Sequence, residues 1–165
     1  MKLRNDLIPT IDMSGRGGAE KVFGPILEDF HRVSKPLWDF ESTEEKVELK
    51  KQKNLQWFDI GKYHNLTKQE KQIVMMFVIH DGNNILSIDT INLQNLLELA
   101  CKDQECQRSG WTYQNIQQCH LMKTSFHKMQ VKVPLKVKYF IAKYRKSFQN
   151  VYLREEERET GVLEK

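Results

Sequence analysis

The sequence has few cysteines, no long apolar run and no strong excess of charge of one sign. No stretch approaches the roughly 18 consecutive apolar residues that span a bilayer, so we expect no contact with a membrane. The three cysteines, Cys101, Cys106 and Cys119, occur without a secretory signal at the N-terminus, which indicates reduced thiols. We therefore expect a cytoplasmic protein, with the nucleus as the alternative compartment.

Recognisable catalytic motifs are also missing. The five histidines are scattered, no serine stands in a nucleophile elbow, and the Gly-rich run 14–18 lacks the Lys-Ser/Thr pair of a phosphate loop. The cysteines with His120 and His127 suggest a zinc site. However, two residues seven positions apart in a helix lie about 10 Å apart along its axis, too far to share one ion. The sequence therefore predicts no enzyme, no metal site and no cofactor.

The composition predicts a single small core with two tails. The chain has 165 residues, of which 39% are hydrophobic, and a formal net charge of +4. We expect an N-terminal arm over residues 1–61, a helical core over residues 62–153 and a charged C-terminal tail over residues 154–165. The mild positive charge permits contact with an acidic surface without requiring one.

Apolar spacing and capping residues predict an all-α fold. Ser42 with Glu45 fits a capping box for a polar helix that reaches about residue 55, and Thr67 with Glu70 fits a second one. A third helix is predicted over residues 112–129. A long final helix is predicted after Pro134, because apolar side chains recur there every three or four residues as far as Tyr152.

The segment 67–100 resembles an EF-hand of the calmodulin, centrin and light-chain type. If Asp81 occupies the first loop position, Ile73 and Phe77 fall where the entering helix needs apolar side chains. Ile88 then falls at position eight, where paired loops form a short β-bridge. The apolar residues that follow, Leu93, Leu96 and Leu97, fall where the leaving helix packs back.

The calcium ligands of such a loop are missing. Ile85 stands at the fifth position, Leu86 replaces the turn glycine, and Asn92 replaces the bidentate glutamate. The resemblance therefore implies a calcium-independent unit, which the third and fourth predicted helices could pair as a second, silent EF-hand. Calcium-free relatives of this kind are structural subunits, such as light chains or cytoskeletal and ciliary scaffolds. We accordingly expect a non-enzymatic subunit that binds proteins in a larger assembly.

Two groups of residues are candidates for partner contact. Trp38, Phe40 and Trp57 could be aromatic anchors for a protein partner, since buried aromatic side chains often dominate interface energies, or they could pack on their own domain. The predicted last helix carries a second group, Lys143, Arg145 and Lys146. These cations could face an acidic protein or a phosphate backbone, or could simply be solvated. The alternative function is therefore a subunit of a ribonucleoprotein or DNA-bound assembly.

Overall fold

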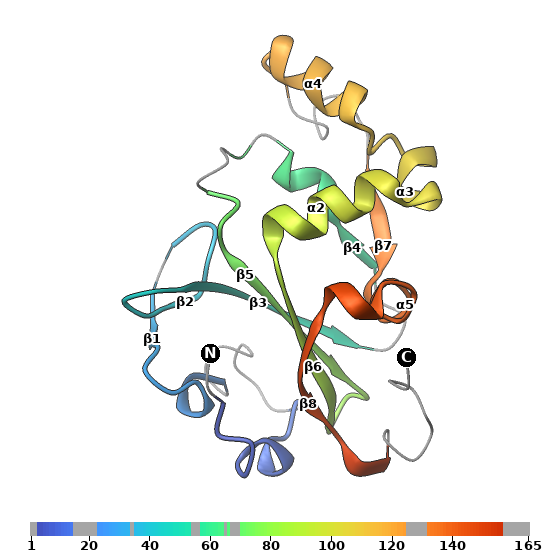
Figure 1. Cartoon of the computed structure of the whole chain (residues 1–165). Coiled ribbons are helices and arrows are strands. Elements are labelled where there is room, and N and C mark those ends of the chain that lie inside the picture. Colours follow the sequence, from blue (N-terminus) through green and yellow to red (C-terminus); the bar gives the residue numbers. More distant parts are fainter. Residues whose placement is uncertain are drawn as a thin grey trace.

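The computed structural model is organised around a six-stranded mixed β-sheet (Figure 1). The strands lie in the order β1-β2-β3-β5-β6-β8, and only β3 and β5 run parallel. Their bounds are His31–Arg32, Phe40–Glu41, Lys46–Lys53, Val74–His80, Ile85–Asn92 and Gln149–Leu153. The structure describes residues 3–14, 23–33, 35–53, 57–64, 66, 70–124 and 132–156.

Short helices and a second, two-stranded sheet complete the fold. The small sheet pairs β4 (Trp57–Asp59) with β7 (Pro134–Lys136) in antiparallel register. The α-helices are α2 (Leu93–Lys102), α3 (Gln104–Arg108), α4 (Tyr113–Leu121) and α5 (Val137–Lys143). The 3₁₀ helices are η1 (Ile8–Thr10), η2 (Gly24–Ile26), η3 (Ile60–Tyr63) and η4 (Arg145–Ser147). No helix in these described ranges is long and apolar enough to cross a membrane.

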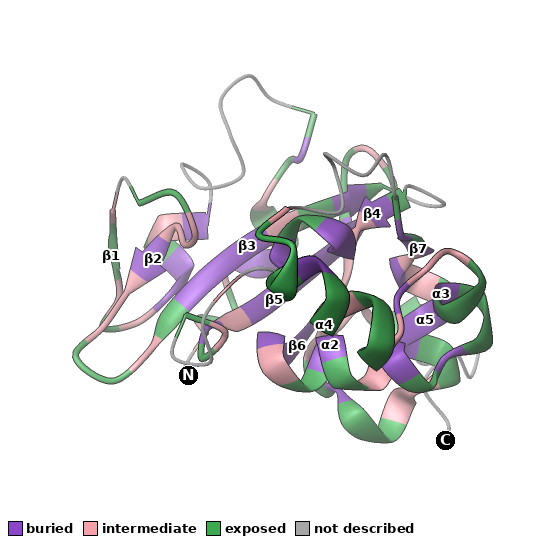
Figure 2. Ribbon diagram, turned by 90° about the horizontal axis from the view of Figure 1, so that it is seen from above, coloured by how far each residue is buried: buried purple, intermediate pink, exposed green. Residues whose placement is uncertain are grey.

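The predicted all-α fold is wrong, because two of the segments predicted as helices are the central strands of the sheet. The polar segment after Ser42 forms β3, and the apolar segment after Glu70 forms β5. In β5, alternate residues pack on opposite faces of the sheet, so nearly the whole strand is buried (Figure 2). A short apolar run that is buried on both faces also contains helical spacings, so periodicity alone could not separate the two structures.

The EF-hand resemblance is also wrong, because its predicted loop is the turn of the β5–β6 hairpin. The Asp81 carboxylate accepts hydrogen bonds from the Asn83 and Asn84 amides at 2.9 and 2.8 Å, and Gly82 has a φ of 109°. An Asp-Gly pair between apolar runs is a strong hairpin signal. The next helix, α2, begins only at Leu93, after Asn92 caps it through the Gln94 amide.

The predicted long final helix is replaced by several short elements. Helix α5 ends at Lys143, and Tyr144 has φ −116° and ψ 40°, outside the helical region. The chain then passes through η4 and returns to the sheet as β8. The third predicted helix corresponds to α4, for which Thr112 is the N-cap, but α4 already ends at Leu121, and residues 125–129 of that prediction lie outside the described residues.

Hydrophobic clusters cover both faces of the sheet. Helices α2 and α5 and the β4–β7 ribbon pack on one face, together with Trp111, which donates its indole N–H to the Leu97 carbonyl at 2.9 Å. The other face is covered by N-terminal residues, which include Ile8, Phe23 and Ile26. The segment predicted as an arm therefore supplies β1 to β4 and much of the second core.

A buried ion pair between Arg145 and Asp89 lies where β8 joins β6 at the edge of the sheet. Arg145 donates to the Asp89 carboxylate at 2.6 Å, and the Asn150 amide donates to the same oxygen at 3.1 Å. Burial raises the pKa of Asp89, and the contacts with Arg145 and Asn150 oppose this shift. Asp89 lies in β6 and Asn150 in β8, so the pair fixes the return of the chain to the sheet.

Replacing Asp89 by Ala should lower the free energy of unfolding by about 3–5 kcal/mol, because the charge of Arg145 would be left buried without its partner. Urea titration of the variant and the wild-type chain measures the difference. Arg4→Ala, which breaks an exposed pair with Glu28 at 4.0 Å, should leave stability almost unchanged. Equal losses in the two variants would contradict a stabilising role for the buried pair.

Candidate functional site

One face of β3 carries buried polar side chains where an apolar face would be expected. Val47 and Leu49 point into the hydrophobic cluster on the face of the sheet that the N-terminal residues cover, and they are two residues apart, as the period of a strand requires. Glu48, Lys50 and Gln52 therefore share the opposite face. Both Glu48 and Gln52 are more than nine-tenths buried, which is rare for these residue types unless they have a specific role.

A carboxyl pair lies at the centre of this polar face. Asp39 is held immediately before β2 by backbone hydrogen bonds to Val33 and Val47, and its carboxylate accepts the Leu49 amide at 2.9 Å. In this position the Asp39 side chain lies close enough to Glu48 to influence the pKa of the Glu48 carboxyl. Burial raises the pKa of Glu48 to about 8, Asp39 adds to the shift, and Lys50 opposes it. Near neutral pH the pair therefore retains a proton.

Two lysines face the carboxyl pair from different elements. The Lys50 ammonium lies 3.6 Å from a Glu48 carboxylate oxygen, and Lys62 reaches the same place from η3, where it contacts Lys50. Partial burial and the neighbouring Lys50 lower the pKa of Lys62. Its Nζ lies 4.9 Å from the centre of the Tyr63 ring, so η3 holds this lysine over the polar face of β3.

Two buried oxygen atoms on this side of the sheet lack hydrogen-bond partners among the described residues. They are the Tyr63 hydroxyl and Gln52 Oε1, which lies four residues beyond Glu48, roughly 13 Å along β3. Burial and the nearby Glu48 and Asp39 raise the pKa of Tyr63, so its ring lies close to the carboxyl pair. Unsatisfied buried polar atoms are uncommon in native proteins and often mark a place where something else binds. We call Asp39, Glu48, Lys50, Gln52, Lys62 and Tyr63 the carboxyl–lysine cluster.

The donor atoms of this cluster suit a hard divalent cation and an anionic group. Carboxylate, amide and phenol oxygens are ligands for ions such as Mg²⁺, which typically uses one or two carboxylates and completes its shell with water and substrate phosphate. No group of three or more His, Cys, Asp or Glu side chains suited to a metal occurs in the part of the chain that the structure describes. A cation held by the Asp39–Glu48 pair would therefore need further ligands from water or substrate.

The residues predicted as partner contacts are distributed over several environments. Trp38 is half-buried next to Asp39, donates its indole N–H to Glu41 at 2.9 Å and lies 4.4 Å from the Lys46 ammonium. Phe40 is completely buried and is a core residue. Arg145 is engaged with Asp89, and Lys146 is exposed on η4.

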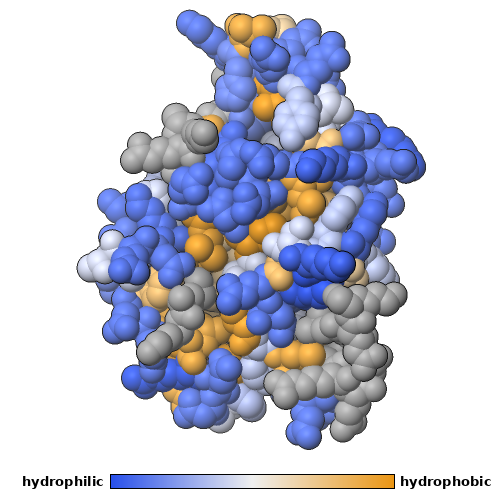
Figure 3. Space-filling view, viewed as in Figure 1, coloured by the Kyte–Doolittle hydropathy of each residue, from blue (hydrophilic) through white to orange (hydrophobic). Residues whose placement is uncertain are grey.

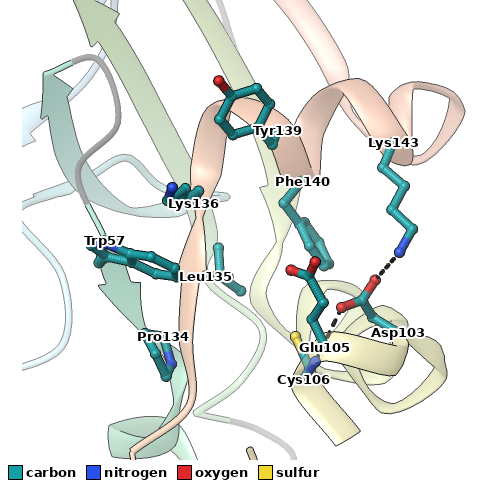
Figure 4. A pocket seen from close by; sticks show the side chains of 10 residues that line it. All are labelled: Trp57, Asp103, Glu105, Cys106, Pro134, Leu135, Lys136, Tyr139, Phe140 and Lys143. Atoms are coloured by element: carbon teal, nitrogen blue, oxygen red, sulfur yellow. Dashed lines mark hydrogen bonds and ion pairs between the residues drawn. The ribbon is translucent and has the colours of Figure 1, made fainter. Parts of the chain in front are cut away.

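Two of the predicted residues, Trp57 and Lys143, line one pocket of about 320 Å³ (Figure 4). Strands β4 and β7 supply one wall, α3 the opposite wall, and α5 the end. Leu135 and Phe140 lie between these walls, and Figure 4 shows Trp57 and Lys136 facing them from the side opposite Glu105. The complete lining is Trp57, Asp103, Glu105, Cys106, Pro134, Leu135, Lys136, Tyr139, Phe140 and Lys143.

The acidic wall of the pocket contains one satisfied and one unengaged carboxylate. Asp103 accepts from the Lys143 ammonium at 2.6 Å, the Tyr144 hydroxyl at 2.7 Å and the Cys106 amide at 3.1 Å. Burial opposes ionisation, but these donors prevail and lower the pKa of Asp103 to about 2. The Glu105 side chain makes no hydrogen bond or ion pair with any described residue, so it can accept one from a ligand.

Among the described residues, the thiols do not gather with other metal-ligating side chains into a group of three or more. Cys101, Cys106 and Cys119 are each buried and unbridged. Burial raises the pKa of Cys101 to about 11 and that of Cys106 to about 12, and also raises that of Cys119. Protonated, buried thiols are poor nucleophiles and poor ligands. His120 lies near His64, with ring centres 5.9 Å apart, and His127 lies outside the described residues.

The carboxyl–lysine cluster could not be predicted while residues 42–55 were expected to form a helix. In a helix, Glu48 and Lys50 would point in different directions, whereas in a strand they share a face. The useful signal was the alternation of apolar Val47 and Leu49 with polar Glu48, Lys50 and Gln52. Lys62 and Tyr63 could not be added from sequence, since the crossover between β3 and β5 brings them to the site.

Comparison with known proteins adds no functional assignment. No protein-family model matches the sequence, and no curated protein matches it. The functional conclusion therefore depends on the chemistry of the described residues.

The pH dependence of stability tests the protonation of Glu48. Because its pKa is raised from 4.5 to about 8, the folded chain holds a proton that the unfolded chain has lost between these values. In metal-chelating buffer the free energy of unfolding should therefore fall as the pH rises from about 4.5 to about 8, and Glu48→Gln should make this slope shallower. Denaturant titrations at a series of pH values measure both slopes.

The matched control is Glu44→Gln, because Glu44 is an exposed glutamate four residues before Glu48. This variant should keep the wild-type slope. A Glu48→Gln chain with the same slope as the wild type would mean that Glu48 ionises normally in the folded protein.

Proposed function

We propose that this protein is a hydrolase that cleaves phosphodiester bonds in nucleic acid, using a divalent metal ion held by Asp39 and Glu48. The observation that carries the proposal is the carboxyl pair of buried Glu48 and half-buried Asp39, with the Lys50 ammonium 3.6 Å from Glu48. A carboxyl pair, a lysine and unsatisfied oxygen atoms in one place are the components expected of a metal-assisted hydrolytic site. The expectation of a non-enzymatic protein did not take this grouping into account.

The electrostatics of the pair favour a cation. Two adjacent carboxylates repel each other, and the repulsion is relieved either by a shared proton or by a bound positive ion. Asp39 and Glu48 would hold such an ion, which would supply an activated water and charge stabilisation at a phosphate oxygen. The Tyr63 hydroxyl, whose pKa is raised by Glu48 and Asp39, lies near enough to the pair to bind water or substrate there.

The lysines provide the other half of the chemistry. In hydrolysis, a water oxygen attacks phosphorus, the bond to the leaving oxygen breaks, and negative charge increases on the phosphoryl oxygens. Lys50, and Lys62 beside it, lie where they can stabilise this charge or orient the attacking water. Because both lysines come from ordered backbone elements, β3 and η3, they need little reorganisation.

The charge around the cluster favours a polyanionic substrate. On the same face of β3, Lys46 adds a third cation to Lys50 and Lys62, whereas Lys51 and Lys53 alternate onto the opposite face. The whole chain has a formal net charge of +4. Closely spaced lysines bind a phosphate backbone without base specificity. This positive charge supports nucleic acid over a small phosphate ester, and it extends the sequence-based alternative of a nucleic-acid-associated protein from the last helix to β3.

A second candidate is the protein-interaction role expected from the sequence. The observation that favours it is α4, which projects from the body of the molecule and carries exposed apolar side chains (Figures 1 and 3). These are Tyr113, Leu121 and, immediately after the helix, Met122, with exposed fractions of 61%, 77% and 61%. Large apolar side chains gathered at one exposed place often contact a partner. Such a role is compatible with hydrolysis at the separate carboxyl–lysine cluster.

The proposed activity predicts metal-dependent cleavage. Purified chain with Mg²⁺ or Mn²⁺ should cut labelled DNA or RNA strands, and excess chelator should stop the reaction. Asp39→Asn, Glu48→Gln and Lys50→Ala should each reduce the rate by roughly 100-fold or more, since each removes charge from the reacting centre. Gel analysis of single- and double-stranded substrates measures the rates.

Two matched variants distinguish loss of chemistry from loss of charge or fold. Glu44→Gln and Lys51→Ala alter exposed residues outside the cluster and should retain most of the activity. Calorimetric titration with Mn²⁺ should detect a site in the wild-type chain that Glu48→Gln removes. Absence of wild-type cleavage with both ions on all substrates, or full activity in Glu48→Gln, would refute the proposal.

A further inference from the structure

We infer that the pocket between β7, α3 and α5 binds one unpaired nucleobase, and that it prefers bases with an exocyclic amino group. The inference rests on the proposed function in that the base belongs to the nucleic-acid substrate. It concerns a different part of the molecule from the carboxyl–lysine cluster, because none of the residues of that cluster lines the pocket (Figure 4).

The rim of the pocket offers two aromatic rings for stacking. Trp57 and Tyr139 are each 58% exposed, although large aromatic side chains are usually well covered. They come from different elements, β4 and α5, and both line the same pocket. Base stacking on exposed aromatic rings is a principal way in which proteins hold unpaired nucleic acid.

A lysine lies between the two rings. The Lys136 ammonium is 4.9 Å from the centre of the Trp57 ring and 5.9 Å from the centre of the Tyr139 ring. A base stacked on either ring would therefore have a cation beside it for its flanking phosphate. Strand β7 fixes Lys136 through its register with Trp57 on β4.

The size and floor of the pocket fit a single base better than a duplex. Its volume of about 320 Å³ lies at the lower end of the range for small-molecule sites. Leu135 and Phe140 provide an apolar floor and are almost completely buried. A flat heterocycle can cover this floor with one face or edge and leave its polar groups directed at the walls.

The acidic wall of the pocket explains why bases with an exocyclic amino group should be preferred. Asp103 is saturated by Lys143, Tyr144 and the Cys106 amide, so it is not free to contact a ligand. Glu105 is on the same wall and has no side-chain partner among the described residues. A carboxylate accepts a hydrogen bond from the amino group of cytosine, adenine or guanine, and thymine and uracil lack this donor.

Binding of short labelled strands in chelator tests the inference without cleavage. Fluorescence anisotropy should show tighter binding of oligo(dC) and oligo(dA) than of oligo(dT). Trp57→Ala and Tyr139→Ala should each weaken oligo(dC) binding by about tenfold, the loss of one stacked base. Glu105→Ala should remove the preference for oligo(dC) and leave oligo(dT) binding unchanged. An oligo(dC) strand with one abasic position should bind less tightly than the intact strand only if that position enters the pocket.

The matched control is Tyr113→Ala, which removes an equally exposed aromatic ring on α4, outside the pocket. It should bind all strands as the wild type does, and thermal unfolding should show that every variant is folded. Equal binding of the strands by the wild type, or a preference that survives Glu105→Ala, would overturn the inference. So would pocket variants that lose a protein partner while binding strands normally.

The two proposals fail in different ways. Metal-dependent cleavage with no base preference in binding would leave the hydrolase proposal standing and refute the nucleobase pocket. Base-selective binding by a chain that cleaves no substrate would refute the hydrolase and retain the pocket.

Discussion

The parallel pairing of β3 with β5 is the constraint on which the rest of the structure depends. Parallel neighbours cannot be joined by a tight turn, so the chain must cross over before it returns. That crossover contains β4 and η3, which place Trp57 at the rim of the pocket and Lys62 and Tyr63 over the polar face of β3. The crossover therefore adds residues to both candidate sites, whereas the Asp39–Glu48 pair itself comes from the antiparallel β2–β3 hairpin.

The two buried acids Glu48 and Asp103 have pKa values that are shifted in opposite directions, although burial disfavours the charged form of both. Asp103 receives three donors, and its pKa falls to about 2. Glu48 has another carboxyl as its neighbour and one lysine at 3.6 Å, and its pKa rises to about 8. The first environment stabilises a fixed anion that organises the fold. The second leaves a carboxyl group incompletely compensated, and such local departures from good packing chemistry are concentrated at functional sites.

Local signals in the sequence identified some boundaries correctly but not the fold. Thr112 was recognised as the start of a helix and Asp81 as the start of a loop, because these signals involve only a few neighbouring residues. The strands were missed because a doubly buried run such as β5 also satisfies helical spacing. The sites were less predictable still. Trp57 and Lys143 line the same pocket although they are far apart in sequence, whereas Arg145 is paired with Asp89. No local sequence pattern distinguishes a residue that lines a pocket from one that forms an internal ion pair.

The late return of the chain as β8 has a consequence for the order in which the protein can be completed. Asp89 and Arg145 are 56 residues apart, and helices α2 to α5 lie between β6 and β8. During synthesis, β6 is therefore finished long before its outer neighbour and the cation that neutralises Asp89 exist. A nascent chain presents an unpaired strand edge with an acid embedded in it, and an embedded charge opposes edge-to-edge association with other chains. Asp89 thus stabilises the finished sheet through its ion pair and, before Arg145 is synthesised, disfavours aggregation through its unpaired charge.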